Sequence, residues 1–85
     1  MELVFNLFFK EKRSKEQVDI LVDNWVEYIE QHQLYYSGGC NETCLSGGIY
    51  FIENENKCQY NEKELKDILR KFYMQNKNLF EDFFL

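Results

Sequence analysis

The chain has 85 residues and a formal net charge of −5 at pH 7; 45% of its residues are hydrophobic and 29% are charged. These values are typical of one globular domain covering residues 1–85, and they exclude a disordered chain. The negative charge argues against nucleic-acid binding through bulk electrostatics, and no apolar run reaches the roughly 18 residues of a membrane span. An odd number of cysteines, three, and a start without the positive region of a secretory signal predict a cytoplasmic protein.

The first part of the chain predicts a strand followed by a helix. Apolar residues recur at every second position over residues 3–9, which is typical of a strand with one buried face. Residues 14–32 then carry apolar side chains at helical spacing, with Trp25 at the centre of the stripe. Ser14 and Gln17 form the sequence pattern of a capping box, which predicts that the helix begins at this point.

The middle of the chain predicts a hairpin. Residues 34–37 and 48–53 are rich in strand-forming side chains, and the Gly38-Gly39 pair is expected to end the first of these strands. Residues 40–48 are expected to form the connecting loop, with glycines serving as turn residues. A polar loop is expected over residues 54–60.

A second helix begins after Asn61, because Asn61 and Glu64 form another capping box and an apolar stripe follows. The stripe consists of Leu65, Ile68, Leu69, Phe72 and Tyr73. Residues 79–85 are expected to form a last strand or an extended tail laid on the core. The predicted class is therefore α+β, in the order β-α-β-β-α-β. This is the ferredoxin-like, two-layer arrangement, with both helices on one face of an antiparallel sheet.

The sequence predicts neither a metal site nor a catalytic site. Cys40 and Cys44 have a spacing that zinc ligands use, but the remaining donors, His32 and Cys58, have no recognised spacing. The thiols are therefore expected to be free and to bind no metal. No histidine, carboxylate or glycine pattern has the layout of a known catalytic or phosphate-binding motif. We accordingly expect no catalytic residues, no cofactor and no enzyme activity.

Two charged surfaces are candidate binding sites. The second helix carries basic residues at helical spacing, and Arg13 lies in the basic turn before the first helix; RNA phosphate is a suitable partner for such groups. The first helix carries a row of carboxylates suited to a basic partner protein. The basic set is Arg13, Lys63, Lys66, Arg70 and Lys71, and the acidic set is Glu16, Asp19, Asp23, Glu27 and Glu30.

From Ser14 to the C-terminus the sequence resembles the YggL family of large-subunit (50S) ribosome-binding proteins. The matching features are Ser-Lys-Glu-Gln-Val-Asp at 14–19, Val22-Asp23, Ile29-Glu30, Leu34, Gly38-Gly39, Gly48 before a strand, Lys57-Cys58, and Leu79-Phe80 followed by acidic residues and an aromatic pair. The resemblance implies a small non-enzymatic cytoplasmic protein that associates with the large ribosomal subunit through rRNA or a ribosomal protein. It supplies no catalytic residues.

One departure from the resemblance keeps a second hypothesis open. Family members, as the resemblance suggests, open with a Lys/Arg-rich segment, whereas this sequence begins almost directly on its first strand. The alternative is a small acidic inhibitor or immunity-type protein, which would use the acidic set to bind a basic protein partner. The oligomeric state is left open by the sequence.

Overall fold

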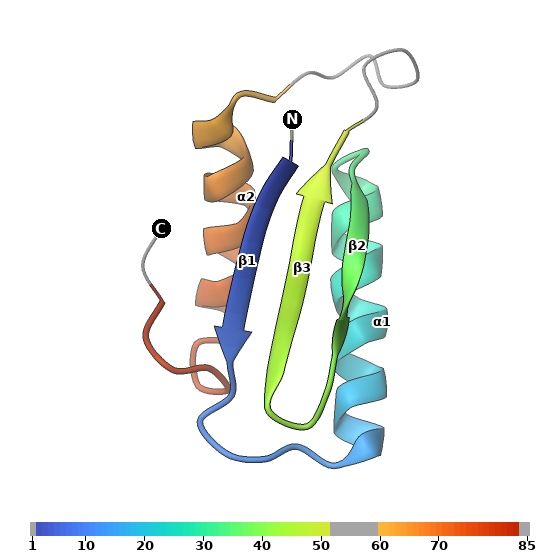
Figure 1. The fold of residues 1–85 in the computed structure, drawn as a ribbon, viewed down its shortest axis with the longest axis vertical. Helices are drawn as coiled ribbons and strands as arrows, with labels where there is room; N and C mark the ends of the chain where they lie inside the picture. The colour runs from blue at the N-terminus through green and yellow to red at the C-terminus, as the bar shows by residue number, and fades with distance from the viewer. Residues whose placement is uncertain (1, 52–59, 84–85) are drawn as a thin grey trace.

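The computed structural model describes residues 2–51 and 60–83, which form a three-stranded sheet and two helices (Figure 1). The elements in chain order are β1 (Glu2–Phe8), α1 (Lys15–Gln31), β2 (Tyr35–Cys40), β3 (Cys44–Tyr50) and α2 (Glu62–Gln75). The sheet is antiparallel with the strand order β1-β3-β2. Both helices cover the same face, and Figure 1 looks onto the other face, which no described element covers. The α+β class with both helices on one face is confirmed.

The alternation in β1 separates the two faces of the sheet as predicted. Leu3, Phe5 and Leu7 are buried toward the helices, whereas the residues between them are exposed. The strand begins and ends one residue earlier than the predicted residues 3–9. Because strand side chains alternate strictly, this shift leaves the predicted core face unchanged.

The hairpin is confirmed, but its strands are longer and its loop shorter than predicted. β2 continues through the glycine pair to Cys40, and only residues 41–43 connect it to β3. Gly38 and Gly47 lie opposite each other with φ angles of 156° and 142°, so they are strand residues and not turn residues. Residues 52–53 of the predicted second strand, and 54–59 of the predicted loop, lie outside the described residues.

Both helices begin at the predicted caps. The Ser14 hydroxyl accepts the Gln17 backbone N–H at 3.2 Å, and the Asn61 side chain accepts the Glu64 N–H at 2.8 Å. Both capping boxes are complete. Trp25 is fully buried between the helix layer and the sheet, where its ring packs edge-on against the nearest aromatic rings. These rings belong to Phe5, Tyr36 and Phe72.

The predicted last strand is not confirmed, and the described part of the chain therefore lacks the final β of the expected order. The only pairing at this position is one antiparallel bridge between Phe9 and Phe80. The chain then leaves the sheet, and Phe83 packs on Tyr73 of α2 with ring centroids 5.9 Å apart. Aromatic contact with the helix thus replaces a hydrogen-bonded ladder along β1. Residues 84–85 lie outside the described residues.

Candidate functional site

The two described cysteines point to different faces of the sheet. Cys40 lies opposite the buried Leu45 and packs against the core, whereas Cys44 lies opposite the exposed Phe8. Alternation along a strand therefore separates the two thiols. Burial raises the pKa of the Cys40 thiol, with a further increase from Cys44, so this thiol stays protonated at neutral pH. Cys58 lies outside the described residues.

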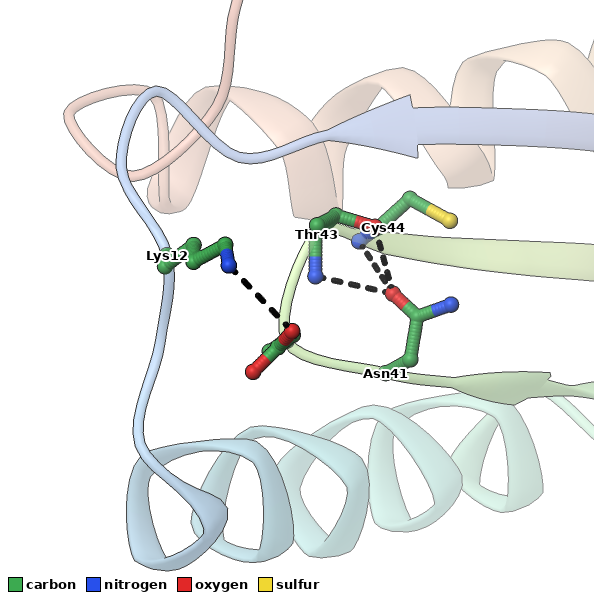
Figure 2. A network of polar contacts seen from close by, with 5 residues as sticks. Lys12, Asn41, Thr43 and Cys44 are labelled. Carbon is green, nitrogen blue, oxygen red and sulfur yellow. Dashed lines mark hydrogen bonds and ion pairs between the residues drawn. The ribbon is translucent and has the colours of Figure 1, made fainter.

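Across residues 2–51 and 60–83, no three His, Cys, Asp or Glu side chains gather as metal ligands would. The tightest polar network is structural and lies in the β2–β3 turn (Figure 2). The Asn41 Oδ1 accepts hydrogen bonds from the Thr43 N–H at 2.8 Å, the Thr43 hydroxyl at 2.7 Å and the Cys44 N–H at 2.9 Å. This network holds the three-residue turn in one shape.

The basic turn before α1 is fastened to the β2–β3 turn. The Arg13 backbone N–H donates to the Glu42 carbonyl at 2.9 Å, and the Lys12 ammonium lies 3.6 Å from the Glu42 carboxylate (Figure 2). The Phe9 N–H also donates to the Thr43 carbonyl at 2.9 Å. The turn that carries Arg13 therefore has a fixed backbone, while the Arg13 side chain remains half-buried at the rim of an open cleft.

The five predicted acidic residues form one surface, here called the acidic row. They are Glu16, Asp19, Asp23, Glu27 and Glu30, and all five are exposed. Their spacing of three or four residues places them along one stripe of α1. None of them forms an ion pair with any residue of the described chain. The structure therefore brings this set together and leaves its negative charge uncompensated.

The predicted basic residues do not form one compact patch. Lys63, Lys66, Arg70 and Lys71, here called the α2 cations, spread around the helix, since Lys66 and Lys71 are separated by roughly 140° at 3.6 residues per turn. Lys66 lies 3.4 Å from Glu62, and Arg70 lies 3.9 Å from Asp67.

Arg13 is remote from the first turn of α2, which holds Lys63. Figure 1 shows that α1 begins at one end of the molecule and α2 at the other. The predicted basic set is therefore divided into two groups, the α2 cations and the turn before α1.

The uncovered face of the sheet exposes large apolar side chains, and it was not among the candidate binding sites named from the sequence. Val4, Phe8 and Tyr35 belong to this face, and 71%, 50% and 40% of their respective surfaces are exposed. Tyr50 stacks on Tyr35 with ring centroids 5.7 Å apart, and Gly48 lies opposite Val4. The alternation in residues 3–9 already contained the signal, because it places Val4 and Phe8 opposite the core.

His32 is the C-cap of α1, and its position gives the protein a pH dependence. The Tyr60 hydroxyl donates to the His32 carbonyl at 2.8 Å, and the imidazole packs against Tyr28. Burial lowers the pKa of His32 below 6.5, and the positive charge of Lys71 lowers it further. The unfolded chain therefore takes up a proton more readily than the folded chain as the pH falls through 6.5.

We expect the free energy of unfolding to decrease between about pH 7.5 and about pH 5.5, with part of the decrease due to His32. Urea melts at both pH values measure it for the wild type and for His32→Asn. The difference between the two pH values should be smaller in the variant, which has no titrating imidazole. An equal difference in both proteins would show that His32 titrates in the folded protein as it does in the unfolded chain.

The fold and its surfaces define a small two-layer α+β protein with a row of exposed carboxylates on α1 and a mixture of cations and carboxylates on α2. The sequence matches the model of the YggL 50S ribosome-binding protein family over residues 1–83. The chain belongs to this family. The match includes β1, which precedes the region where the resemblance was noted. No curated protein and no solved structure matches the chain. In the described ranges no helix is long and apolar enough to cross a membrane.

Proposed function

We propose that this protein is a non-enzymatic cytoplasmic protein that associates with the large (50S) ribosomal subunit. Membership of the YggL 50S ribosome-binding protein family, matched over residues 1–83, is the observation that carries the proposal. The described residues also expose charged side chains on both helices, which are available to contact a partner.

The α2 cations and Arg13 are the proposed contacts to the subunit. Lys63 and Lys71 have no ion pair within the described chain, so they can meet phosphate directly. Lys66 and Arg70 are held only by exposed pairs with neighbouring carboxylates, and such pairs are worth about 0–1 kcal/mol. Phosphate can therefore replace those carboxylates at low cost.

The acidic row supports a second candidate, contact with a basic protein partner. Five carboxylates on one stripe repel each other, and a cationic surface laid against them would relieve that repulsion. An inhibitor or immunity-type protein would use this row and not the α2 cations. The two candidates therefore assign opposite roles to the two helices.

Charge reversal separates the two candidates. We expect the Lys66→Glu/Arg70→Glu variant to bind 50S subunits at least about tenfold more weakly than the wild type at low salt, because two attractive contacts become repulsive. The matched variant, Asp23→Lys/Glu27→Lys, makes the same number of reversals on α1 and should retain binding. Co-sedimentation of each variant with purified subunits measures the effect. If only the Asp23→Lys/Glu27→Lys variant loses binding, the acidic row is the contact surface.

A further inference from the structure

Within residues 2–51 and 60–83, no strand pairs with the outer edge of β1. β1 pairs with β3 on one side only, because the sheet order is β1-β3-β2. On its other side the described chain contributes only the short contact around Phe9 and Phe80. There the Lys10 N–H donates to Leu79 and the Glu81 N–H donates to Phe8. From Glu2 to Leu7 the edge carries no described partner.

The hydrogen-bonding groups that face outward along this edge can be assigned. Phe9 donates its N–H to Thr43 in the β2–β3 turn, so the odd-numbered residues of β1 direct their backbone groups toward β3. The even-numbered residues direct theirs outward, as the bonds of Phe8 and Lys10 to the C-terminal segment also show. The N–H and C=O groups of Val4 and Asn6 therefore point away from the sheet.

Among the described residues, the middle of the β1 edge carries little protection against pairing with another chain. Proteins protect edge strands with lysines, prolines, bulges or very short strands. β1 has seven residues, an unbroken register with β3, no proline and no lysine. Its one charged residue is Glu2. An unprotected apolar edge of this kind is a template for adding a strand.

The outward backbone groups of β1 are suited to binding an extended polypeptide. Outward N–H and C=O groups that recur at every second residue match the backbone of a strand, and an RNA chain does not present this alternation. A second copy of this protein would offer its own β1 edge in the same way, and the oligomeric state of the free protein distinguishes it from another extended polypeptide.

We propose that β1 binds an extended segment of a ribosomal protein of the 50S subunit as an added strand. The inference rests on the proposed function and names the partner class for it. The added strand would occupy the place of the predicted last strand of the ferredoxin-like order. It would lie on the side of the sheet where α2 packs on β1 (Figure 1).

Proline at an outward-facing position tests the proposal. Val4→Pro removes an outward N–H and leaves the β1–β3 ladder intact, so an edge strand should tolerate it. Val4→Thr is the matched control, because it keeps the N–H and a β-branched side chain. We expect Val4→Pro to weaken co-sedimentation with 50S subunits at least about tenfold and Val4→Thr to leave it within about twofold of the wild type. Asn6→Pro removes the next outward N–H and is used if Val4→Pro does not fold.

The outcomes separate this inference from the proposed function. If folded Val4→Pro and Asn6→Pro bind subunits like the wild type, strand addition is wrong and the ribosomal function stands. If the wild type itself never binds subunits, both are wrong. A photo-crosslinker at Val4 should label a ribosomal protein, and labelling of rRNA alone would contradict the proposal. Sedimentation velocity of the free protein should show a monomer, whereas a dimer abolished by Val4→Pro would identify a second copy as the occupant.

Discussion

Replacing Trp25 with alanine is expected to lower the free energy of unfolding by about 3–5 kcal/mol, the usual cost of truncating a buried aromatic side chain. Trp25 has no exposed surface, and its ring contacts Phe5 of the sheet and Phe72 of α2. It therefore joins both helices to the sheet. Because domains of this kind are stable by only about 5–15 kcal/mol, the variant should lose a large part of its stability.

A urea melt measures this loss, and Trp25→Phe is the control. The indole Nε1 is buried and has no hydrogen-bond partner within the described residues, so phenylalanine keeps an aromatic ring and removes an unsatisfied donor. Trp25→Phe should therefore cost less than Trp25→Ala. A shift below about 1 kcal/mol for Trp25→Ala would contradict the position of Trp25 in the core.

Replacing Gly38 with alanine is expected to destabilise the protein by about 3 kcal/mol or more. Its φ of 156° is strained for any residue with a side chain, and such strain costs about 1–3 kcal/mol. A Cβ atom at this position would also lie 2.5 Å from the Cα of Gly47 and against the Ser46 carbonyl. Both neighbours are backbone atoms of β3, so relief requires the hairpin to distort.

Gly39→Ala is the matched control, one residue further along the same strand. A Cβ atom at Gly39 has no neighbour within 4 Å, so this variant should melt within about 0.5 kcal/mol of the wild type. Thermal or urea unfolding of both variants gives the comparison. Equal stability of Gly38→Ala and the wild type would show that β2 and β3 do not approach as closely at this point as the structure indicates.

The elements with strong local signals were predictable from the sequence. Both helices begin at capping boxes that involve residues three apart, and their buried stripes follow the helical period. The alternation of β1 likewise identified its buried face. These signals involve residues that are close together in the sequence, so they can be recognised without knowledge of the tertiary contacts.

The errors concern features that depend on distant contacts. Gly38 was interpreted as the end of a strand, but it lies within β2 opposite Gly47 of β3. The two backbones approach so closely at this pair that a Cβ atom on Gly38 would clash with Gly47. The predicted last strand was not confirmed. After the bridge at Phe80 the chain does not continue along β1, and Phe83 packs instead on Tyr73 of α2. Neither partner is visible from local spacing.

The candidate surfaces were predictable to different extents. The acidic row lies within one helix, so periodicity alone placed its members together. The basic set combined residues of two segments, because Arg13 precedes α1 and the other members lie on α2, and the two helices begin at opposite ends of the molecule. The open edge of β1 was not predicted, because it exists only through the absence of the expected last strand from the described chain.

The central claim, association with the 50S subunit, is tested most directly by sedimenting the wild-type protein with purified subunits through a sucrose cushion. The net charge of −5 allows few phosphate contacts, so the account predicts co-sedimentation with 50S subunits at about 50 mM salt and a marked loss at about 200 mM. Purified 30S subunits serve as the control and should not retain the protein. Failure to co-sediment with 50S subunits at the lower salt concentration, or equal retention by 30S subunits, would contradict the account.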